Sequence, residues 1–227
     1  MNKILSIVFV LLLSVPGFAQ ESQTRNIGPF TGVKVAEGID VYLIKGDKES
    51  AKVEVYGTPI QNVITEVSGS YLKVHMRDGN YKGRVEAKVF VTYTQLEKLS
   101  ASSAGNIYSQ GVIKTSSLEV GTSSAGTIEI EVDAGEMDLS ASSAGEIEVK
   151  GRAKALKADA SSAGEIDAYD LEVESVVVDA SSAGSIKVNV KEALSANASS
   201  GGSIRYRGNP SKSITNSSSG GSVKKSS

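Results

Sequence analysis

The stretch ASSAGEIEVKG (residues 141–151) holds five small residues, a short alternating segment and a glycine. The small-residue phrase returns at Ala160 as ASSAGEI, and seven copies occur in the chain. The copies begin at Ala101, Thr122, Ala141, Ala160, Ala180, Ala198 and Ser217, at spacings of 21, 19, 19, 20, 18 and 19 residues. A fixed phrase with a period near 19 predicts a stacked solenoid in which each copy forms one coil.

Apolar and polar residues alternate on both sides of the phrase. Leu156 and Ala158 precede the copy at Ala160, and Ile166 and Ala168 follow it at every second position. Such alternation is typical of strands with one buried face. The aliphatic residue that closes each phrase should form an inward ladder: Ile107, Ile128, Ile147, Ile166, Ile186, Ile204 and Val223. The sequence therefore predicts an all-β fold, a parallel β-helix (β-solenoid), and the usual crossover hand favours the right-handed form.

The small residues themselves should form the sharp corner of each coil. We expect glycine to supply backbone freedom there, with alanine and serine inside the bend. Stacked serine hydroxyls can satisfy one another or a corner carbonyl.

Residues 30–99 also alternate, but in longer and less regular segments such as GIDVYLIKGD and RVEAKVFVTY. They predict a wider, less regular N-terminal β region, made of broad coils or a β cap. The expected organisation is a signal peptide (residues 1–19), a tail (20–29), this β region (30–99) and the repeat solenoid (100–227).

The first residues, MNKILSIVFVLLLSVPGFAQ, combine a basic start, a short apolar run and a small-x-small site that ends at Ala19. This pattern is typical of a secretory signal peptide. No second apolar stretch follows, so we expect no transmembrane segment in the mature chain. The expected location is periplasmic, outer-membrane-associated or secreted. Cysteine is absent, so packing and backbone pairing must stabilise the fold without disulfides.

The formal net charge is -2, and the basic residues are scattered. A nucleic-acid partner is therefore not expected. The chain has one histidine, His75, and no nucleophile, base and electrophile that converge on one point. We therefore expect no catalytic residues.

The order of motifs resembles a known family. A signal peptide, FTGVKV, GIDVYLIKGD, KVEVYG, YLKV and VFVTYTQLEKLSASSAGNI precede the serial Ser-Ser-Ala-Gly repeats. This order resembles the putative auto-transporter adhesin family, head GIN domain, of Gram-negative bacteria, over about residues 30–222. The resemblance implies a right-handed parallel β-helix similar to pectin-lyase folds but without lyase machinery. It also implies a role in cell adhesion, by carbohydrate binding along the small-residue strip.

Two sets of side chains are candidate ligand sites. Outward serines of the phrase could form a flat track, about 29 Å long at the usual strand spacing, that binds a polysaccharide or cell-surface glycan. The alternative is corner packing alone. The serines that we assign to the track are Ser102, Ser123, Ser142, Ser161, Ser181, Ser199 and Ser218.

Acidic side chains follow the glycines in two outward columns. The first runs Asn106, Thr127, Glu146, Glu165, Ser185 and Ser203, and the second runs Tyr108, Glu129, Glu148, Asp167, Lys187 and Arg205. Like charges about 5 Å apart repel unless they are solvated or bridged by a cation. A Ca²⁺ site at Glu146, Glu165, Glu148 and Asp167 is one hypothesis. A solvated acidic face without any cofactor is the other, and no glycine-aspartate loop motif frames the carboxylates.

The sequence thus favours a non-catalytic, exported cell-envelope protein that is adhesin-like or binds carbohydrate. A polysaccharide-active enzyme on a β-helix and a purely structural spacer are the alternatives. The oligomeric state is unknown from the sequence.

Overall fold

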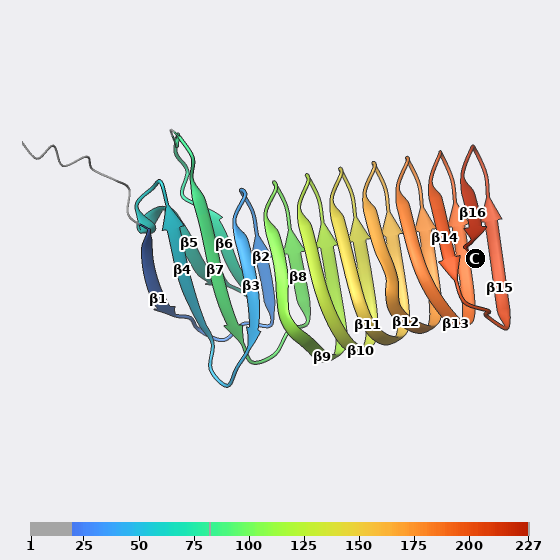
Figure 1. Ribbon diagram of the computed structural model, residues 1–227, viewed down its shortest axis with the longest axis horizontal. Coiled ribbons are helices and arrows are strands. Elements are labelled where there is room, and N and C mark those ends of the chain that lie inside the picture. Colours follow the sequence, from blue (N-terminus) through green and yellow to red (C-terminus); the bar gives the residue numbers. More distant parts are fainter. Residues whose placement is uncertain (1–19, 82, 227) are drawn as a thin grey trace, which may run out of the picture.

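The computed structural model describes residues 20–81 and 83–226. The expected signal peptide, residues 1–19, lies outside the described residues. The described chain forms a flattened rod of parallel coils stacked along one axis, and Figure 1 shows the coils from blue to red. The parallel β-solenoid predicted from the repeat is therefore confirmed.

Each repeat coil runs down one side of the rod, bends, and returns up the other side to a corner. We call the two sides the post-corner sheet and the pre-corner sheet. In Figure 1 the corners form the upper edge of the rod, and the bends form its lower edge. The repeat strands are β8 (Lys98–Ala101), β9 (Asn106–Thr122), β10 (Thr127–Ala141), β11 (Glu146–Ala160), β12 (Glu165–Ala180), β13 (Ser185–Ala198), β14 (Ser203–Arg207), β15 (Lys212–Ser217) and β16 (Ser222–Lys225).

Neighbouring coils pair in parallel with equivalent positions aligned. Ile128 of β10 lies opposite Ile147 of β11, and Ile147 lies opposite Ile166 of β12. The coil of β9 is longer, and the register shifts where Glu129 and Glu131 of β10 pair with it. Side chains at one repeat position therefore form columns along the rod.

The N-terminal region begins as a coil and ends as a cap. Strands β2 (Gly32–Val35) and β3 (Asp40–Lys45) pair in parallel with β8 and β9 and flank an additional corner at residues 36–39. The remaining elements are β1 (Glu21–Asn26), β4 (Ser50–Tyr56), the 3₁₀ helix η1 (Ile60–Asn62), β5 (Val63–Ser68), β6 (Tyr71–Met76) and β7 (Glu86–Tyr93). Antiparallel pairs among these strands close the end: β1 pairs with β4, β4 with β7, and β5 with β6.

Arg25 links the two sheets at this capped end. Its guanidinium donates to the carbonyl oxygens of Val63 at 2.6 Å and Ile60 at 2.9 Å, and to the Oγ1 atom of Thr65 at 3.0 Å. Burial lowers the pKa of Arg25 from its ordinary value. The side chain thus satisfies carbonyl groups where the regular stacking of coils stops.

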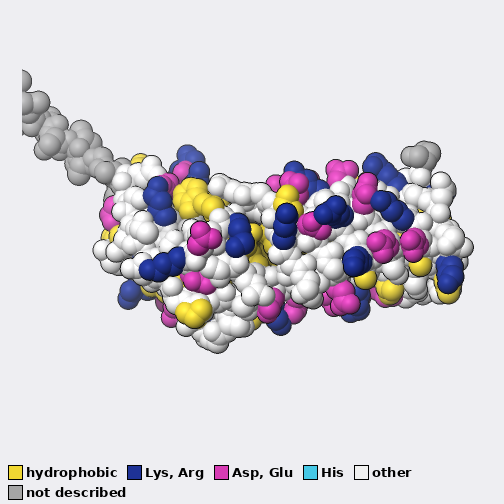
Figure 2. All heavy atoms as spheres, turned by 90° about the horizontal axis from the view of Figure 1, so that it is seen from below, with side chains coloured by type: hydrophobic (Ala, Val, Ile, Leu, Met, Phe, Trp, Pro, Cys, Tyr) yellow, Lys and Arg dark blue, Asp and Glu magenta, His cyan; other side chains and the backbone are white. Residues whose placement is uncertain are grey.

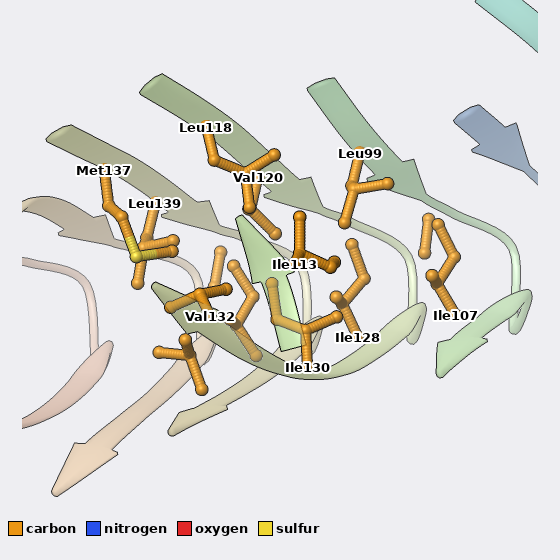
Figure 3. Packing of buried hydrophobic residues seen from close by; sticks show 14 of the residues in the cluster. Leu99, Ile107, Ile113, Leu118, Val120, Ile128, Ile130, Val132, Met137 and Leu139 are labelled. Atoms are coloured by element: carbon orange, nitrogen blue, oxygen red, sulfur yellow. The ribbon is translucent and has the colours of Figure 1, made fainter. Parts of the chain in front are cut away.

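The core lies between the two sheets, where their inward side chains meet. Ile107 and Ile128 from the post-corner sheet face Leu118, Val120 and Leu139 from the pre-corner sheet (Figure 3). The predicted aliphatic ladder is buried from Ile107 to Ile204, while Val223 in the last coil is only partly buried.

The lower edge of the rod carries mixed charges. Figure 2 shows Lys and Arg side chains interspersed with Asp and Glu side chains along it. One contributing column runs Lys114, Asp133, Arg152 and Glu172, so its sign alternates from coil to coil. No helix within the described residues has the length and hydrophobicity needed to cross a membrane.

Candidate functional site: the corner ridge

Each Ser-Ser-Ala-Gly phrase forms a tight two-residue turn. In the corner at Ser161, the N–H of Gly164 donates to the carbonyl oxygen of Ser161 at 2.8 Å. The central residues Ser162 and Ala163 have φ values of 50° and 60°, and positive φ at both centres defines a type I′ turn. The left-handed conformation therefore falls on serine and alanine. The expectation that glycine supplies the backbone freedom is therefore wrong for the five Ser-Ser-Ala-Gly corners, whereas Gly201 and Gly220 of the last two corners do have positive φ values.

The phrase glycine is required instead by the close approach of the preceding coil. A Cβ atom at Gly164 would lie 2.3 Å from the carbonyl oxygen of Ala141. The same contact would be 2.5 Å at Gly126 and 2.3 Å at Gly184, Gly202 and Gly221. Any side chain at this position would push two coils apart.

The turns also hydrogen-bond to one another along the rod. The N–H of Ala163 donates to the carbonyl oxygen of Ser182 in the next coil at 3.1 Å, and equivalent bonds join all neighbouring corners of the repeat. Ser162 and Ala163 are themselves exposed. Alanine thus lies outside the bend, contrary to the expectation from the sequence.

The serine hydroxyls of the seven corners form no hydrogen bond within residues 20–81 and 83–226. The expectation that they satisfy each other or a corner carbonyl is therefore wrong. The seven predicted site serines lie in register along the upper edge of the rod. Ser102, Ser123, Ser142, Ser161, Ser181 and Ser199 are half-buried, and Ser218 is exposed.

We name this edge the corner ridge, comprising the seven Ser-Ser-Ala-Gly or Ser-Ser-Gly-Gly turns between Ser102 and Gly221. In the first six turns only the two central residues are exposed, and in the last turn Ser218 is exposed as well. The ridge is therefore narrower than the broad flat track that the sequence suggests.

The ridge keeps strained residues where glycine would fit. Five corners have alanine at the third position, with φ values between 58° and 61°. The last two corners have Gly201 and Gly220 there, each with open space around its Cα atom. The left-handed conformation costs about 1–2 kcal/mol for a residue with a Cβ atom, more than the roughly 0.4–1 kcal/mol that glycine loses through the flexibility of the unfolded chain. Local stability alone does not explain the Ser-Ala pairs.

A hollow of about 320 Å³ lies on the pre-corner sheet beside the ridge. Ser100, Gly121 and Ser140 form its small-residue floor, and Ser123 and Ser142 of the ridge line it as well. At its N-terminal end it is lined by Tyr71 and by Lys98, whose Nζ atom is 2.8 Å from the Oε2 atom of Glu119. The hollow thus adds hydroxyl groups and one aromatic ring to the ridge.

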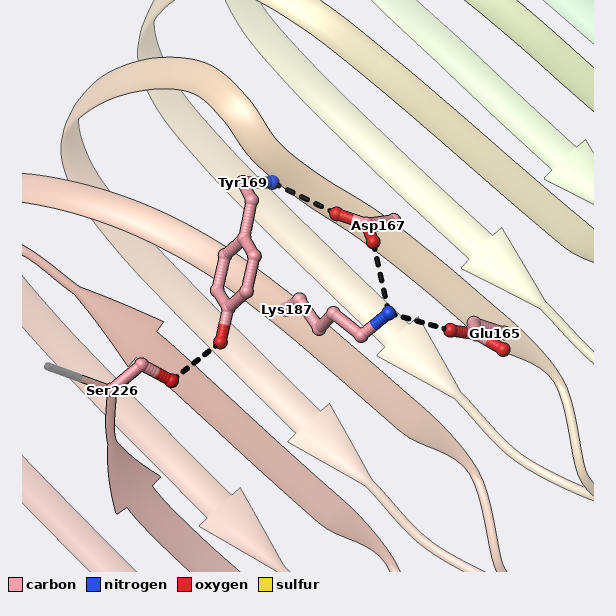
Figure 4. Close-up of polar contacts among 5 residues, drawn as sticks. All are labelled: Glu165, Asp167, Tyr169, Lys187 and Ser226. Atoms are coloured by element: carbon pink, nitrogen blue, oxygen red, sulfur yellow. Dashed lines mark hydrogen bonds and ion pairs between the residues drawn. The ribbon is translucent and has the colours of Figure 1, made fainter.

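The predicted acidic columns lie on the post-corner sheet, away from that hollow. Glu146 pairs with Glu165, and Glu148 pairs with Asp167, in neighbouring coils. The Nζ atom of Lys187 lies 3.0 Å from the Oε1 atom of Glu165 and 2.9 Å from the Oδ2 atom of Asp167 (Figure 4). An ammonium group therefore bridges two of the four carboxylates proposed for calcium.

Elsewhere in these columns, like charges are less well compensated. Burial raises the pKa of Glu129 from its ordinary value, and repulsion by Glu148 and Glu146 adds to the shift. The described residues contain no group of three or more His, Cys, Asp or Glu side chains placed to hold a metal ion. Calcium binding stays a prediction.

An aromatic stack continues the second column toward the N-terminus. The ring centroid of Tyr42 lies 5.1 Å from that of Phe90 and 5.3 Å from that of Tyr108. The sequence did not predict this stack, because the corner before Tyr42 lacks the repeat phrase and reads Ala36-Glu37-Gly38-Ile39. The alternation on both sides of Glu37-Gly38 is the signal that could have located it.

Residues 29–210 match the family model described as putative auto-transporter adhesin, head GIN domain. A crystal structure of a putative adhesin from Bacteroides fragilis is 17% identical, with a TM-score of 0.81 over 93% of this chain and 99% of that chain. A putative adhesin from Parabacteroides merdae is 17% identical, with a TM-score of 0.75 over 92% of this chain and 96% of that chain. A putative lipid binding protein from Parabacteroides distasonis is 20% identical, with a TM-score of 0.72 over 92% of this chain and 97% of that chain. At these identities the structures share the fold. No curated protein matches the chain.

Proposed function

Since the chain belongs to the family described as putative auto-transporter adhesin, head GIN domain, we propose that it is an exported, non-catalytic adhesin-like module. Its ligand in this proposal is an extended cell-surface glycan that lies along the corner ridge. The predicted site serines from Ser102 to Ser218 supply the contacts, and the hollow beside Tyr71 is a wider part of the same surface.

The observation that carries the proposal is the chemistry of the ridge. Its serine hydroxyls are free of protein partners within the described residues, so they can donate to and accept from sugar hydroxyls. Strained backbone that does not stabilise the fold is typical of functional sites. Here the strain recurs at Ser162-Ala163 and at each equivalent pair from Ser103 to Ala183.

The periodicity of the ridge favours a polymer over a small molecule. Corners recur once per coil, about 4.8 Å apart, so each offers the same weak contact to a ligand that runs along the rod. Linked weak contacts raise the overall affinity through effective concentration. A groove that encloses one sugar is not needed for such binding.

An enzyme on the same fold would need a different arrangement of side chains. Catalysis needs unlike groups that converge on one reacting atom. His75, the single histidine, has its Nδ1 atom 2.9 Å from the carbonyl oxygen of Met76 and its Nε2 atom 3.8 Å from Glu66. Neither contact joins it to the ridge serines, which repeat one residue type in every coil.

A glycan array probed with the mature chain tests the proposal, followed by calorimetric titration of the best-binding oligosaccharide. Replacing Ser142, Ser161 and Ser181 by lysine one at a time should lower the affinity and leave the midpoint of thermal unfolding nearly unchanged, and the combined variant should lower the affinity at least tenfold. Ser175→Lys is the matched control, because Ser175 is exposed on the pre-corner sheet away from the ridge. Absence of binding to every glycan contradicts the proposal, and cleavage of a bound glycan contradicts its non-catalytic part.

A further inference from the structure

One outward column of the post-corner sheet separates its charges by sign. The pairing register aligns Glu129, Glu148 and Asp167 in successive coils, and then Lys187, Arg205 and Lys224. All six residues are exposed or half-buried. Three acids are thus followed directly by three bases along the rod.

The wider charge distribution follows the same division. Residues 119–149 contain eight Asp or Glu and no Lys or Arg, whereas residues 193–227 contain five Lys or Arg and no Asp or Glu. Residues 119–149 are therefore strongly acidic and residues 193–227 purely basic, with Lys150, Arg152, Lys154 and Lys157 following the acidic stretch directly.

The column along the lower edge avoids this separation. Along the lower edge, the Nη2 atom of Arg152 lies 2.5 Å from the Oδ2 atom of Asp133, and the Nζ atom of Lys191 lies 2.6 Å from the Oε2 atom of Glu172. Alternation of this kind neutralises each charge by its neighbour in the next coil. Like charges side by side on a sheet are destabilising, so the separated column does not serve the stability of the single rod.

Most of the separated charges have no partner in their own chain. Within the described residues, ion pairs in this column involve only Asp167 and Lys187, at the boundary between the signs. Glu129, Glu148, Arg205 and Lys224 form none. The column therefore leaves two acids on one side of the boundary and two bases on the other available to another molecule.

We propose that this column is the contact surface of a symmetric antiparallel dimer, in which a second copy of the chain covers the post-corner sheet. A twofold axis that crosses the column between Asp167 and Lys187 reverses the order of charges. It places Glu148 against Arg205 of the partner subunit and Glu129 against Lys224 of the partner subunit. The sequence of three acids and three bases is complementary to its own reverse, as an isologous interface requires.

The neighbouring columns are compatible with this register. The same axis places Glu165 opposite Ser185 of the partner subunit and Glu146 opposite Ser203 of the partner subunit, so carboxylates meet small hydroxyl groups. Lys150 and Arg207 would approach each other as like charges. Both have partners within their own chain, Glu131 at 3.6 Å from Lys150 and the ring of Tyr169 at 4.0 Å from Arg207.

Sedimentation velocity over a series of protein concentrations tests the dimer. At about 0.05 M salt the unmodified protein should shift from monomer to dimer as its concentration rises, and about 1 M salt should reverse the shift because the Debye length falls to about 3 Å. Glu148→Lys and Arg205→Glu should each weaken association at least tenfold. The double variant should restore it, since the swapped charges meet again across the axis.

Glu136→Lys is the matched control. Glu136 is exposed on the pre-corner sheet, and its replacement changes the net charge by the same amount. It should leave association unchanged. A protein that is monomeric at every concentration overturns the proposal, as does a double variant no better than the single ones or a control as disruptive as Glu148→Lys. The assay contains no glycan, so its result is independent of the function proposed for the ridge.

Discussion

Lys187 lies one coil beyond Asp167 in the same outward column, and its Nζ atom is 2.9 Å from the Oδ2 atom of Asp167. The hydrogen bonds to Asp167 and Glu165 raise the pKa of Lys187 to about 12. The ammonium group of Lys187 lies where the acidic part of the column meets the basic part. It relieves the repulsion that the sequence suggests for Glu165 and Asp167.

Replacement of Lys187 by Met should therefore lower the free energy of unfolding by up to about 1 kcal/mol, because the pair is partly exposed and screened. The folded pKa of Lys187 is above its ordinary value of 10.5, so its stabilising contribution is present below pH 10.5 and is lost as the pH rises through 12. Urea unfolding of both proteins at pH 8 and at rising alkaline pH measures this difference. A gap that stays constant up to pH 12 contradicts the assignment.

Gly164→Ala should destabilise the rod by roughly 2–4 kcal/mol. The new Cβ atom would lie 2.3 Å from the carbonyl oxygen of Ala141, and the neighbouring atoms of Ala141 and Ser142 are backbone atoms that cannot shift easily. Gly201→Ala is the control, because its Cα atom faces open space and five other corners have alanine at that position. Its cost should stay near 1 kcal/mol or below. Equal effects on the denaturant midpoint would show that close stacking is not the reason for the phrase glycine.

Ala163→Gly should raise the free energy of unfolding by about 0.5–1 kcal/mol. Ala163 has a φ of 60°, and relief of this strain exceeds the added entropy of the unfolded chain. Ala158→Gly is a useful comparison, because Ala158 is a buried strand residue and should lose stability on the same change. A loss of stability at Ala163 as well would mean that the alanine methyl group is needed for the fold.

Glu129→Gln should stabilise the protein slightly near pH 7, by less than about 1 kcal/mol because the site is largely exposed. The folded pKa of Glu129 is raised above the ordinary 4.5, first by burial and then by Glu148 and Glu146. Its protonated form is therefore favoured by folding. The stability of the unmodified protein relative to Glu129→Gln is greatest below pH 4.5 and declines as the pH rises through the higher folded pKa of Glu129. The advantage of Glu129→Gln should accordingly vanish in acid, and an advantage that grows in acid would contradict the sign.

The sequence predicts the core because two simple periods coincide. Alternation marks one face of each strand, and the repeat brings equivalent residues together, so the burial of Ile147 and Ile166 follows from spacing alone. The same reasoning places all seven site serines on one edge of the rod.

The sequence does not predict the conformation of the corners. A repeat period locates a turn without giving its φ values, and an alanine or serine with a positive φ is unfavourable by local preference. The distance between Gly164 and the carbonyl oxygen of Ala141 depends on how two coils stack. The corner at residues 36–39 is missed for a different reason. The fourth residue of this corner is Ile39 and not glycine. The strand after the corner, β3, pairs with β7 on its N-terminal side, and no repeat corner lies there.

The glycan ridge is tested most directly by the dependence of affinity on ligand length. Calorimetric titration with a size series of the oligosaccharide that binds best on the array measures it. The affinity should rise with each added unit until the oligosaccharide spans the ridge, roughly 29 Å for seven corners, and then level off. An affinity independent of length, or one unaffected by lysine at Ser142, Ser161 and Ser181, would contradict a ridge that binds a polymer.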